Sequence, residues 1–239
     1  HYCGCNAIPL GRGETLAPYI KALEREIKLV TGMIDKNRPV SQIHYGGGSP
    51  DILDPDQISR LNDLVLSQFN TIDNPEIAIE CNPAYTDMTY ISGLLRAGFN
   101  RFSFGIQDFD SRILRDLNRD PAKTGLRELT DLIKGHDKNI SINFDFIYGL
   151  PGQTAESFSD SIAEAASMRP GRIVTFSYAH VPWLKKHQQI LAKKGLPEAG
   201  EKMKMFMSAS DILKGKGYRQ IGLDHFILPE DDLYMAFEN

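Results

Sequence analysis

Apolar residues near the start of the chain recur at steps of three and four positions, with lysine and glutamate residues between them. The residues that follow this spacing are Ile20, Leu23, Ile27, Val30 and Ile34. Because side chains three and four positions apart share one side of an α-helix, the pattern predicts an amphipathic helix over residues 17–34.

After this helix, short apolar segments rich in β-branched and aromatic residues alternate with longer segments of helical spacing. The strand-like segments are residues 40–45, 76–82, 101–107, 140–148, 173–179 and 220–223. The helix-like segments are residues 88–97, 111–117, 122–135, 155–168 and 198–216, with one more helix starting at Pro55. There, Asp54 can cap the first turn, Pro55 suits its first position, and Gln57 completes a capping box.

This alternation indicates the fold class. Each strand-like segment reads as apolar on both faces, which together with the regular alternation favours a parallel sheet covered by helices. We expect an α/β protein built as a barrel or open barrel; a doubly wound open sheet is the alternative, because the pattern does not reveal strand order. No repeat of about 20–50 residues interrupts the chain, so we expect one domain over residues 1–239.

Polar or small residues stand where the predicted strands end. They are Gly46, Gly47, Gly48, Ser49, Glu80, Gln107, Asp145, Tyr148, Ala179, His180, Asp224 and His225. In parallel α/β folds the carboxyl ends of the strands meet at one edge, and ligands bind there. Converging at that edge, the acidic and amide groups would form a polar pocket able to hold a ribose and an amino acid head group.

Several of these residues also have purely structural interpretations. Three glycines after a strand can form a sharp turn, although they also let a ligand approach the backbone closely. The run matches neither the dinucleotide-binding nor the P-loop glycine pattern. Glu80 follows an apolar segment, which predicts that its carboxylate is at least partly buried. A buried carboxylate either pairs with a positively charged group or has a function. Considered singly, Gln107 could be a buried amide whose hydrogen bonds are all made within the core. Arg119 could be an ordinary surface arginine.

Composition narrows the class of protein. The chain has 239 residues, 41% hydrophobic and 24% charged, with a formal net charge of −4, which is typical of a soluble globular protein. No apolar run approaches the roughly 20 residues that span a bilayer, and no signal peptide is visible. Three cysteines do not make a disulfide framework, so we expect a reducing cytoplasm. The mild acidity offers no general attraction to nucleic acid.

A local charge imbalance occurs late in the chain. From Val181 to Arg219, nine basic residues stand against three acidic ones. A solvated helix face explains such a run. The functional alternative is a surface that attracts a polyanion, either a small molecule with several carboxylates or RNA.

Two cysteines near the amino end, Cys3 and Cys5, are separated by one residue, and the chain has one other, Cys81. By itself, this C-x-C arrangement fits two buried thiols, a redox pair or half of a zinc site.

Taken in order, the motifs resemble the radical S-adenosylmethionine (SAM) enzymes and, more narrowly, the oxygen-independent coproporphyrinogen III oxidases. Residues 2–6 (YCGCN) resemble the end of that family's C-x3-C-x2-C motif with the Gly-Cys-Asn after it, and residues 44–50 (HYGGGSP) resemble its H-W-G-G-G-T-P. Further matches are Glu80, residues 105–109 (GIQDF), 118–119 (NR), Asp145, 147–151 (IYGLP), 178–180 (YAH) and 224–226 (DHF). The resemblance covers nearly the whole chain.

The resemblance implies a partial (β/α)6 TIM-like barrel of the radical SAM type, in which Cys3 corresponds to the third thiolate ligand of a [4Fe–4S] cluster. The chain starts inside the cysteine motif, so two cluster cysteines and the first strand would precede His1. The family's C-terminal helical domain would follow Asn239. We therefore expect a fragment in the apo form that is inactive by itself.

The resemblance also implies an oxidoreductase of haem biosynthesis. In the family, the reduced cluster splits SAM into methionine and a 5′-deoxyadenosyl radical. This radical removes hydrogen from the β-carbon of a propionate, and loss of CO2 and an electron leaves a vinyl group. Two such events convert coproporphyrinogen III to protoporphyrinogen IX. The expected partners are this substrate and an electron donor, without nucleic acid or membrane, and the expected state is a monomer.

By the same resemblance, cofactor-binding roles fall on residues at the predicted strand ends and at the amino end. Positions that bind a first SAM correspond to Tyr2, Gly47, Gly48, Ser49 and Glu80. Positions that line a second SAM correspond to Gln107, Arg119, Asp145 and Ala179.

Two other functions are alternatives. A haem-chaperone branch of the superfamily binds haem and SAM without oxidising coproporphyrinogen, and it has Phe where this chain has Cys5. Cys5, Asn6 and the pair Asn118 and Arg119 favour the oxidase. An RNA-modifying radical enzyme would use the late basic stretch, but the matches at residues 178–180 and 224–226 argue against it.

Overall fold

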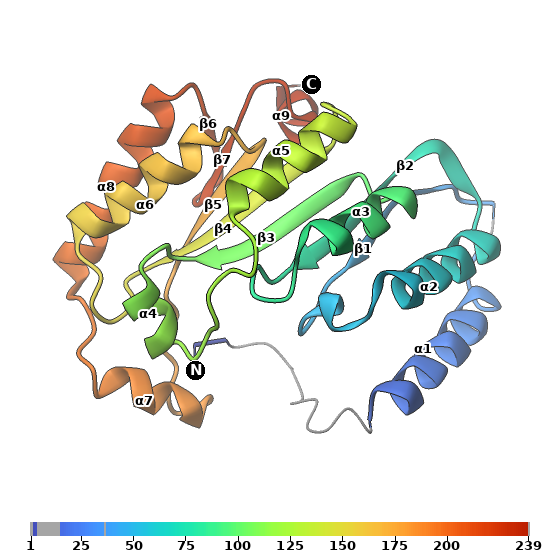
Figure 1. Ribbon diagram of the computed structural model, residues 1–239, viewed down its shortest axis with the longest axis horizontal. Helices are drawn as coiled ribbons and strands as arrows, with labels where there is room; N and C mark the ends of the chain where they lie inside the picture. Colours follow the sequence, from blue (N-terminus) through green and yellow to red (C-terminus); the bar gives the residue numbers. More distant parts are fainter. Residues whose placement is uncertain (1, 4–14, 36, 239) are drawn as a thin grey trace.

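The computed structural model describes residues 2–3, 15–35 and 37–238, and within them seven strands form one sheet (Figure 1). The strands are β1 (Val40–Tyr45), β2 (Thr71–Cys81), β3 (Arg101–Gln107), β4 (Ser141–Tyr148), β5 (Arg172–Ser177), β6 (Arg219–Ile221) and β7 (His225–Ile227). Their order in the sheet is β1-β2-β3-β4-β5-β7-β6. Strands β1 to β5 pair in parallel, and β7 pairs antiparallel with both β5 and β6. The predicted α/β class with a mainly parallel sheet is confirmed.

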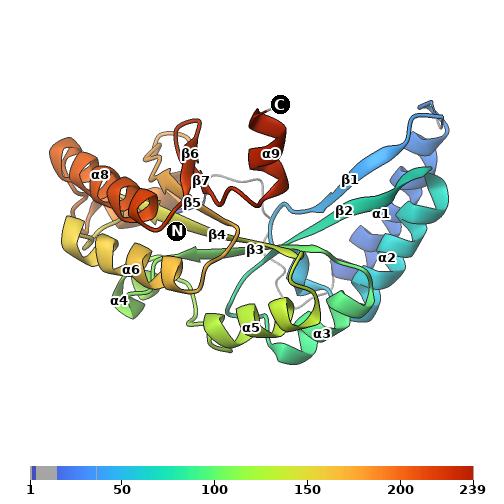
Figure 2. The same ribbon diagram turned by 90° about the horizontal axis from the view of Figure 1, so that it is seen from above.

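The helices lie mainly on one side of a curved sheet. They are α1 (Leu16–Thr31), α2 (Pro55–Gln68), α3 (Met88–Arg96), α4 (Ser111–Asp116), α5 (Leu126–His136), α6 (Ala155–Ser167), α7 (Gln189–Ala192), α8 (Ala199–Gly215) and α9 (Asp232–Glu238), with 3-10 turns at Pro50–Ile52 and Lys186–Gln188. Seen from above, the sheet forms an arc with α1, α2, α3, α5, α6 and α8 on its outer side (Figure 2). The short α4 and α7 lie beyond the carboxyl ends of the central strands (Figure 1).

The expectation that each strand is apolar on both faces is wrong. In β3, the outward side chains Phe102, Phe104 and Ile106 are at most 4% exposed, whereas the inward positions Arg101 and Ser103 are partly exposed. The helices cover the outer face, so apolar side chains pack there and form the core. The inner, concave face of the arc carries polar residues, and we call this face the bowl (Figure 2).

Local sequence signals set some of the helix boundaries, including those of α2, α3, α4 and α6, each of which has a side-chain cap at its first turn. At the start of α2, the Asp54 side chain accepts from the Gln57 N–H (2.8 Å) and the Gln57 side chain accepts from the Asp54 N–H (3.0 Å), which confirms the predicted capping box. Strand β2 begins five residues earlier than predicted, at Thr71, because that residue pairs with Val40 of β1. The helix predicted from residue 122 begins at Leu126.

One strand was missed. Residues 225–227 form β7, which inserts between β5 and β6, so the strand predicted at residues 220–223 does not pair with β5. A three-residue strand has too little periodicity to be recognised from sequence. Because β6 runs in the same direction as β5, Asp224 and His225 still lie toward the carboxyl edge of the sheet.

Among the described residues, no helix has both the length and the apolar character needed to cross a bilayer. The single domain expected over residues 1–239 stays a prediction.

Candidate functional site

The strand register brings polar side chains from different strands onto one inner face. Glu80 of β2 pairs with Ser103 of β3, and Ser103 pairs with Asn143 of β4. One step toward the carboxyl edge, Gly105 pairs with Asp145. Residues paired in a parallel sheet point to the same face, so Glu80 and Asp145 face the same bowl from neighbouring levels.

The Glu80 carboxylate lies beneath the glycine loop that follows β1. Its Oε1 is 3.1 Å from His44 Nε2, and 46% of the Glu80 side chain is exposed. A Cβ at Gly46 would lie 2.8 Å from Glu80 Oε1, so any other residue there would displace the Glu80 carboxylate. Gly47 has a φ of +116°, a conformation that favours glycine. The loop therefore passes close to a carboxylate that can still accept hydrogen bonds from a ligand.

Asp145 is held by two polar neighbours on the inner face. Ser103 Oγ donates to its Oδ2 (2.9 Å) and Asn143 Nδ2 donates to its Oδ1 (2.8 Å). Burial raises the pKa of the Asp145 carboxyl, and these two hydrogen bonds act in the opposite direction. The nearby Glu80 carboxylate raises the pKa of Asp145 further. Two neighbouring carboxylates in a partly buried bowl suit ligands with hydroxyl or ammonium donors.

Arg119 joins three separate parts of the chain. Its Nη1 donates to the Tyr2 hydroxyl (2.8 Å), and its Nη2 donates to Asn82 Oδ1 (2.8 Å) and to the Gly105 carbonyl (2.6 Å). The guanidinium carbon also lies 6.0 Å from the centre of the Tyr2 ring. Arg119 is therefore not an ordinary surface arginine, because it holds the amino end of the chain against the carboxyl ends of β2 and β3.

Gln107 lies at the end of β3 in a left-handed conformation, with φ of 70°, and is 8% exposed. Its Nε2 lies 2.9 Å from where a Cβ at Gly105 would be, so glycine makes room for this amide. Non-glycine residues rarely adopt such a φ, and they do so mainly at functional or tightly constrained positions.

The amino end of the chain lies over the exit of β5. Gln188 Nε2 donates to the Tyr2 carbonyl (2.8 Å) and to the Ala179 carbonyl (3.1 Å). Cys3, which follows Tyr2, is exposed, whereas Cys81 is buried. The structure thus brings Tyr2, Cys3 and Ala179 to the side of the bowl that Gln107, Arg119 and Asp145 also border.

Residues 1–165 match the Radical SAM superfamily. The chain belongs to the radical SAM superfamily. An oxygen-independent coproporphyrinogen III oxidase of Synechocystis sp. is 40% identical over 236 residues, covering 99% of this chain and 50% of that protein. One of Pseudomonas aeruginosa is 36% identical over 242 residues, covering 100% and 52%. The chain spans about half the length of these curated relatives.

A solved structure of a radical SAM enzyme shares the fold. Coproporphyrinogen III oxidase (HemN) from Escherichia coli has a TM-score of 0.88 and 36% identity to this chain, covering 99% of this chain and 54% of the enzyme. The similarity supports the interpretation of the curved sheet as a TIM-like barrel of the radical SAM type.

Membership in the radical SAM superfamily implies a [4Fe–4S] cluster and SAM. The glycine loop against Glu80 and the open inner face suit a ligand with amine and hydroxyl donors. Cys3 supplies one exposed thiol, and no group of three or more metal-ligating side chains occurs within the described residues. Cys3 therefore fits one ligand position of a cluster. Cys5 and Asn6, which by sequence resemblance favour the oxidase over the haem chaperone, lie outside the described residues.

The sequence prediction missed several residues that bind the candidate site residues: Ser103, Asn143, Asn82 and Gln188. Ser103 and Asn143 could have been found from the two-residue period of β3 and β4, because Asn143 is two positions before Asp145. Asn82 and Gln188 carried no such signal. Asp108, within one of the matching motifs, is buried among Gln153 and Ser161 and has a structural role.

The two histidines at strand ends make local contacts. His180 Nδ1 lies 3.2 Å from the Tyr178 hydroxyl, and His225 Nδ1 lies 2.9 Å from Asp224 Oδ1. These contacts assign no catalytic role to either residue.

The basic residues from 181 to 219 do not act as one surface. Lys202 is partly buried, with its Nζ 3.2 Å from the Tyr178 carbonyl, and burial lowers its pKa. Lys194 pairs with Asp116 (2.5 Å), and Lys204 lies 3.6 Å from Glu201. Because one of these lysines is partly buried and two lie beside carboxylates, the stretch does not form one continuous positive surface. An RNA-modifying enzyme would need such a surface to bind a polyanion.

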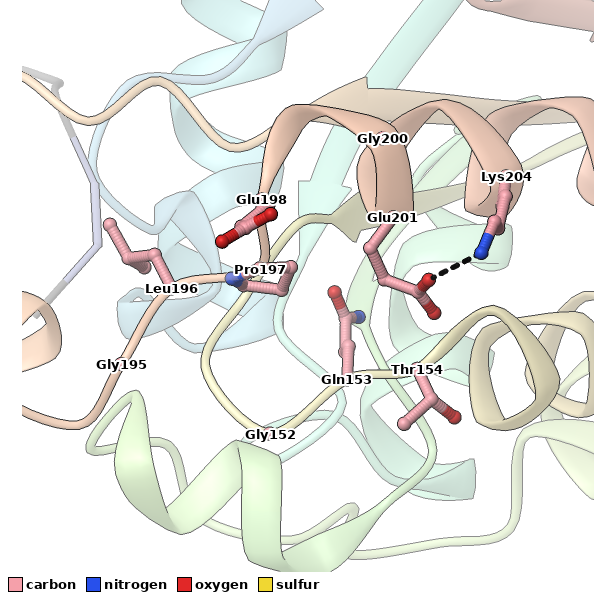
Figure 3. Close-up of a pocket in the computed structure, with 10 residues that line it drawn as sticks. All are labelled: Gly152, Gln153, Thr154, Gly195, Leu196, Pro197, Glu198, Gly200, Glu201 and Lys204. Atoms are coloured by element: carbon pink, nitrogen blue, oxygen red, sulfur yellow. Dashed lines mark ion pairs between the residues drawn. The ribbon is translucent and has the colours of Figure 1, made fainter.

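A cavity of about 590 Å³ lies outside the bowl, between the loop after β4 and the start of α8 (Figure 3). Its lining includes Gln153, Pro197 and Glu201 but none of the predicted site residues. Glu201 Oε1 accepts from the N–H of Ala155, the first residue of α6 (2.8 Å), so this carboxylate already has a partner within the protein. A smaller cavity of about 380 Å³ between α1 and α2 reaches Gly46, Gly48 and Ser49 from the outer side.

Proposed function

We propose that the chain carries the radical SAM core of an oxygen-independent coproporphyrinogen III oxidase, an oxidoreductase of haem biosynthesis. The observation that carries this proposal is the likeness to the E. coli enzyme over 99% of the chain, at 36% identity and a TM-score of 0.88. Curated relatives with the same function in their names cover the same span. A cytoplasmic location, a monomeric state and a separate electron donor belong to the same proposal.

In this proposal, the glycine loop and Glu80 bind the first SAM. The backbone of Gly47, Gly48 and Ser49 would meet the methionyl end, and the half-exposed Glu80 carboxylate would accept its hydrogen bonds. Tyr2 would pack against the same cofactor, and the Cys3 thiolate would hold the cluster beside it.

A second SAM would lie farther round the bowl, against Gln107, Arg119, Asp145 and Ala179. Support comes from Arg119, which reaches Tyr2 and therefore touches both proposed cofactor positions. A guanidinium suits the carboxylate of SAM, because it donates several hydrogen bonds in a fixed plane.

When bound, the cluster and SAM would supply the radical that removes hydrogen from a substrate propionate. The chain's own residues would orient the reactants and keep stray hydrogen donors out. The partly buried Asp145, held by Ser103 and Asn143, gives the bowl a fixed polar wall rather than a mobile one.

An anaerobic assay of the cluster-loaded, full-length protein tests this function. With SAM and a reductant, coproporphyrinogen III should lose CO2 and yield protoporphyrinogen IX. No turnover despite an intact cluster, together with tight stoichiometric haem binding in a titration, would instead identify a haem chaperone.

Replacing Arg119 tests the second cofactor position. Arg119→Ala should lower kcat/KM for coproporphyrinogen by about 10–100-fold, because hydrogen bonds to charged groups contribute about 1.5–3 kcal/mol. Iron content should stay unchanged. Arg115→Ala, an exposed arginine on α4, serves as the matched control. Unchanged kinetics in the Arg119 variant would remove this residue from the site.

A further inference from the structure

Gln188 is a buried amide at the end of the 3-10 turn Lys186–Gln188, and it is 1% exposed. Its Nε2 donates to the carbonyls of Tyr2 (2.8 Å) and Ala179 (3.1 Å), and its Oε1 accepts from the Val181 N–H (2.7 Å). Both amide hydrogens and the carbonyl oxygen therefore have partners.

The chemistry of these partners leaves one orientation for the amide. Its nitrogen faces two carbonyl oxygens, and its oxygen faces an N–H. A flipped amide would place oxygen against oxygen and an NH2 group against an N–H, and it would lose all three hydrogen bonds. No other neutral side chain offers two donors and an acceptor at this reach.

The neighbouring residue contacts the same segment. His187 Nε2 lies 3.0 Å from the Cys3 carbonyl, so two successive side chains of one turn contact two successive carbonyls at the amino end. The Tyr2 side chain packs against an apolar cluster that includes Tyr178 and Leu191, on either side of this turn. The Cys3 backbone is thereby held relative to the exit of β5.

We propose that Gln188 is a positioning residue that couples the cysteine-bearing segment to the cofactor position at Ala179. A single amide joins the backbone beside Cys3 to the backbone at the end of β5. Its loss lets these two segments separate, so a cluster on Cys3 and a SAM bound in the bowl no longer share one fixed geometry. The inference rests on the cofactor sites proposed above and is independent of the identity of the substrate.

The test uses the full-length protein with a reconstituted cluster and no porphyrin substrate. Gln188→Leu removes all three hydrogen bonds while keeping a side chain of similar volume. Gln188→Glu keeps the acceptor for Val181 but cannot donate to the two carbonyls when ionised. Gln189→Leu changes an exposed neighbour and is the control. Iron content, SAM affinity and the electron paramagnetic resonance spectrum of the reduced cluster with and without SAM are measured.

We expect both Gln188 variants to retain iron, to bind SAM roughly 10–100-fold more weakly, and to lose the spectral change that SAM causes in the wild type. Gln189→Leu should match the wild type. If a Gln188 variant keeps iron and wild-type SAM affinity, the proposal is overturned. Loss of iron and fold in both variants also overturns it, since Gln188 would then serve folding alone. Absence of any SAM response in the wild type would refute the cofactor sites themselves.

Discussion

The buried carboxyl of Asp51 makes a measurable prediction about stability and pH. Asp51 lies in the 3-10 turn after the glycine loop and is 6% exposed. Its Oδ2 accepts from the Asn82 N–H and, at 3.4 Å, from Thr86 Oγ1, while its Oδ1 has no hydrogen-bond partner among the described residues. Burial raises the pKa of Asp51 to about 6, although these hydrogen bonds and Arg119 favour the ionised form.

Asp51→Asn should therefore stabilise the protein at neutral pH. An amide oxygen can still accept from the Asn82 N–H, and the variant buries no charge. The pKa of Asp51 lies about two units above the unfolded value, and each unit corresponds to about 1.36 kcal/mol, so the gain has an upper limit of about 3 kcal/mol. We expect about 1–2 kcal/mol, because relaxation around a buried charge reduces its cost.

The sign of the pH dependence follows from the raised pKa. The folded protein binds a proton at Asp51 more tightly than the unfolded chain does. The resulting contribution to the free energy of unfolding is fully present below about pH 4 and is lost as pH rises through about 6. The advantage of Asp51→Asn should thus be largest above about pH 6 and should vanish toward about pH 4.

Urea unfolding of both proteins across this pH range measures the difference directly. Asp87→Asn is the control. The Lys123 side chain and the Tyr90 N–H lower the pKa of the partly exposed Asp87, so its replacement should cost stability at neutral pH. An Asp51→Asn protein no more stable than the wild type at about pH 8, or a difference that does not change with pH, would refute the reasoning.

Two further changes test the fold and the bowl. Arg172→Ala leaves the buried Asp231 without the guanidinium that binds its Oδ1, and we expect a loss of about 3–5 kcal/mol in the free energy of unfolding; a loss below about 1 kcal/mol would contradict a buried ion pair. Gly46→Ala places a Cβ 2.8 Å from Glu80 Oε1, so SAM affinity should fall while the fold persists. In the control Gly135→Ala the Cβ meets no atom within 4 Å, and equal affinity in the two variants would argue against a role for the glycine loop.

Much of the site could be predicted because its residues stand at strand ends. Glu80 and Gln107 close or nearly close their strands, Asp145 lies in the second half of its strand, and parallel strands bring their carboxyl ends to one edge. The partners of these residues could not be assigned in the same way. The Ser103 hydroxyl that binds Asp145 comes from another strand, and its contact depends on the register between β3 and β4.

The sequence by itself determined the helices except the short α7 and α9, the strands except β7, and the edge at which polar groups gather. Hydrophobic spacing and capping residues act over a few positions, so a short sequence window suffices to recognise them. Tertiary structure decided which face of the sheet is polar, where β7 inserts, and how the amino end is held. Arg119 meets Tyr2 across 117 positions and Gln188 meets Tyr2 across 186. Contacts between residues so far apart follow from the path of the whole chain, and no local pattern encodes them.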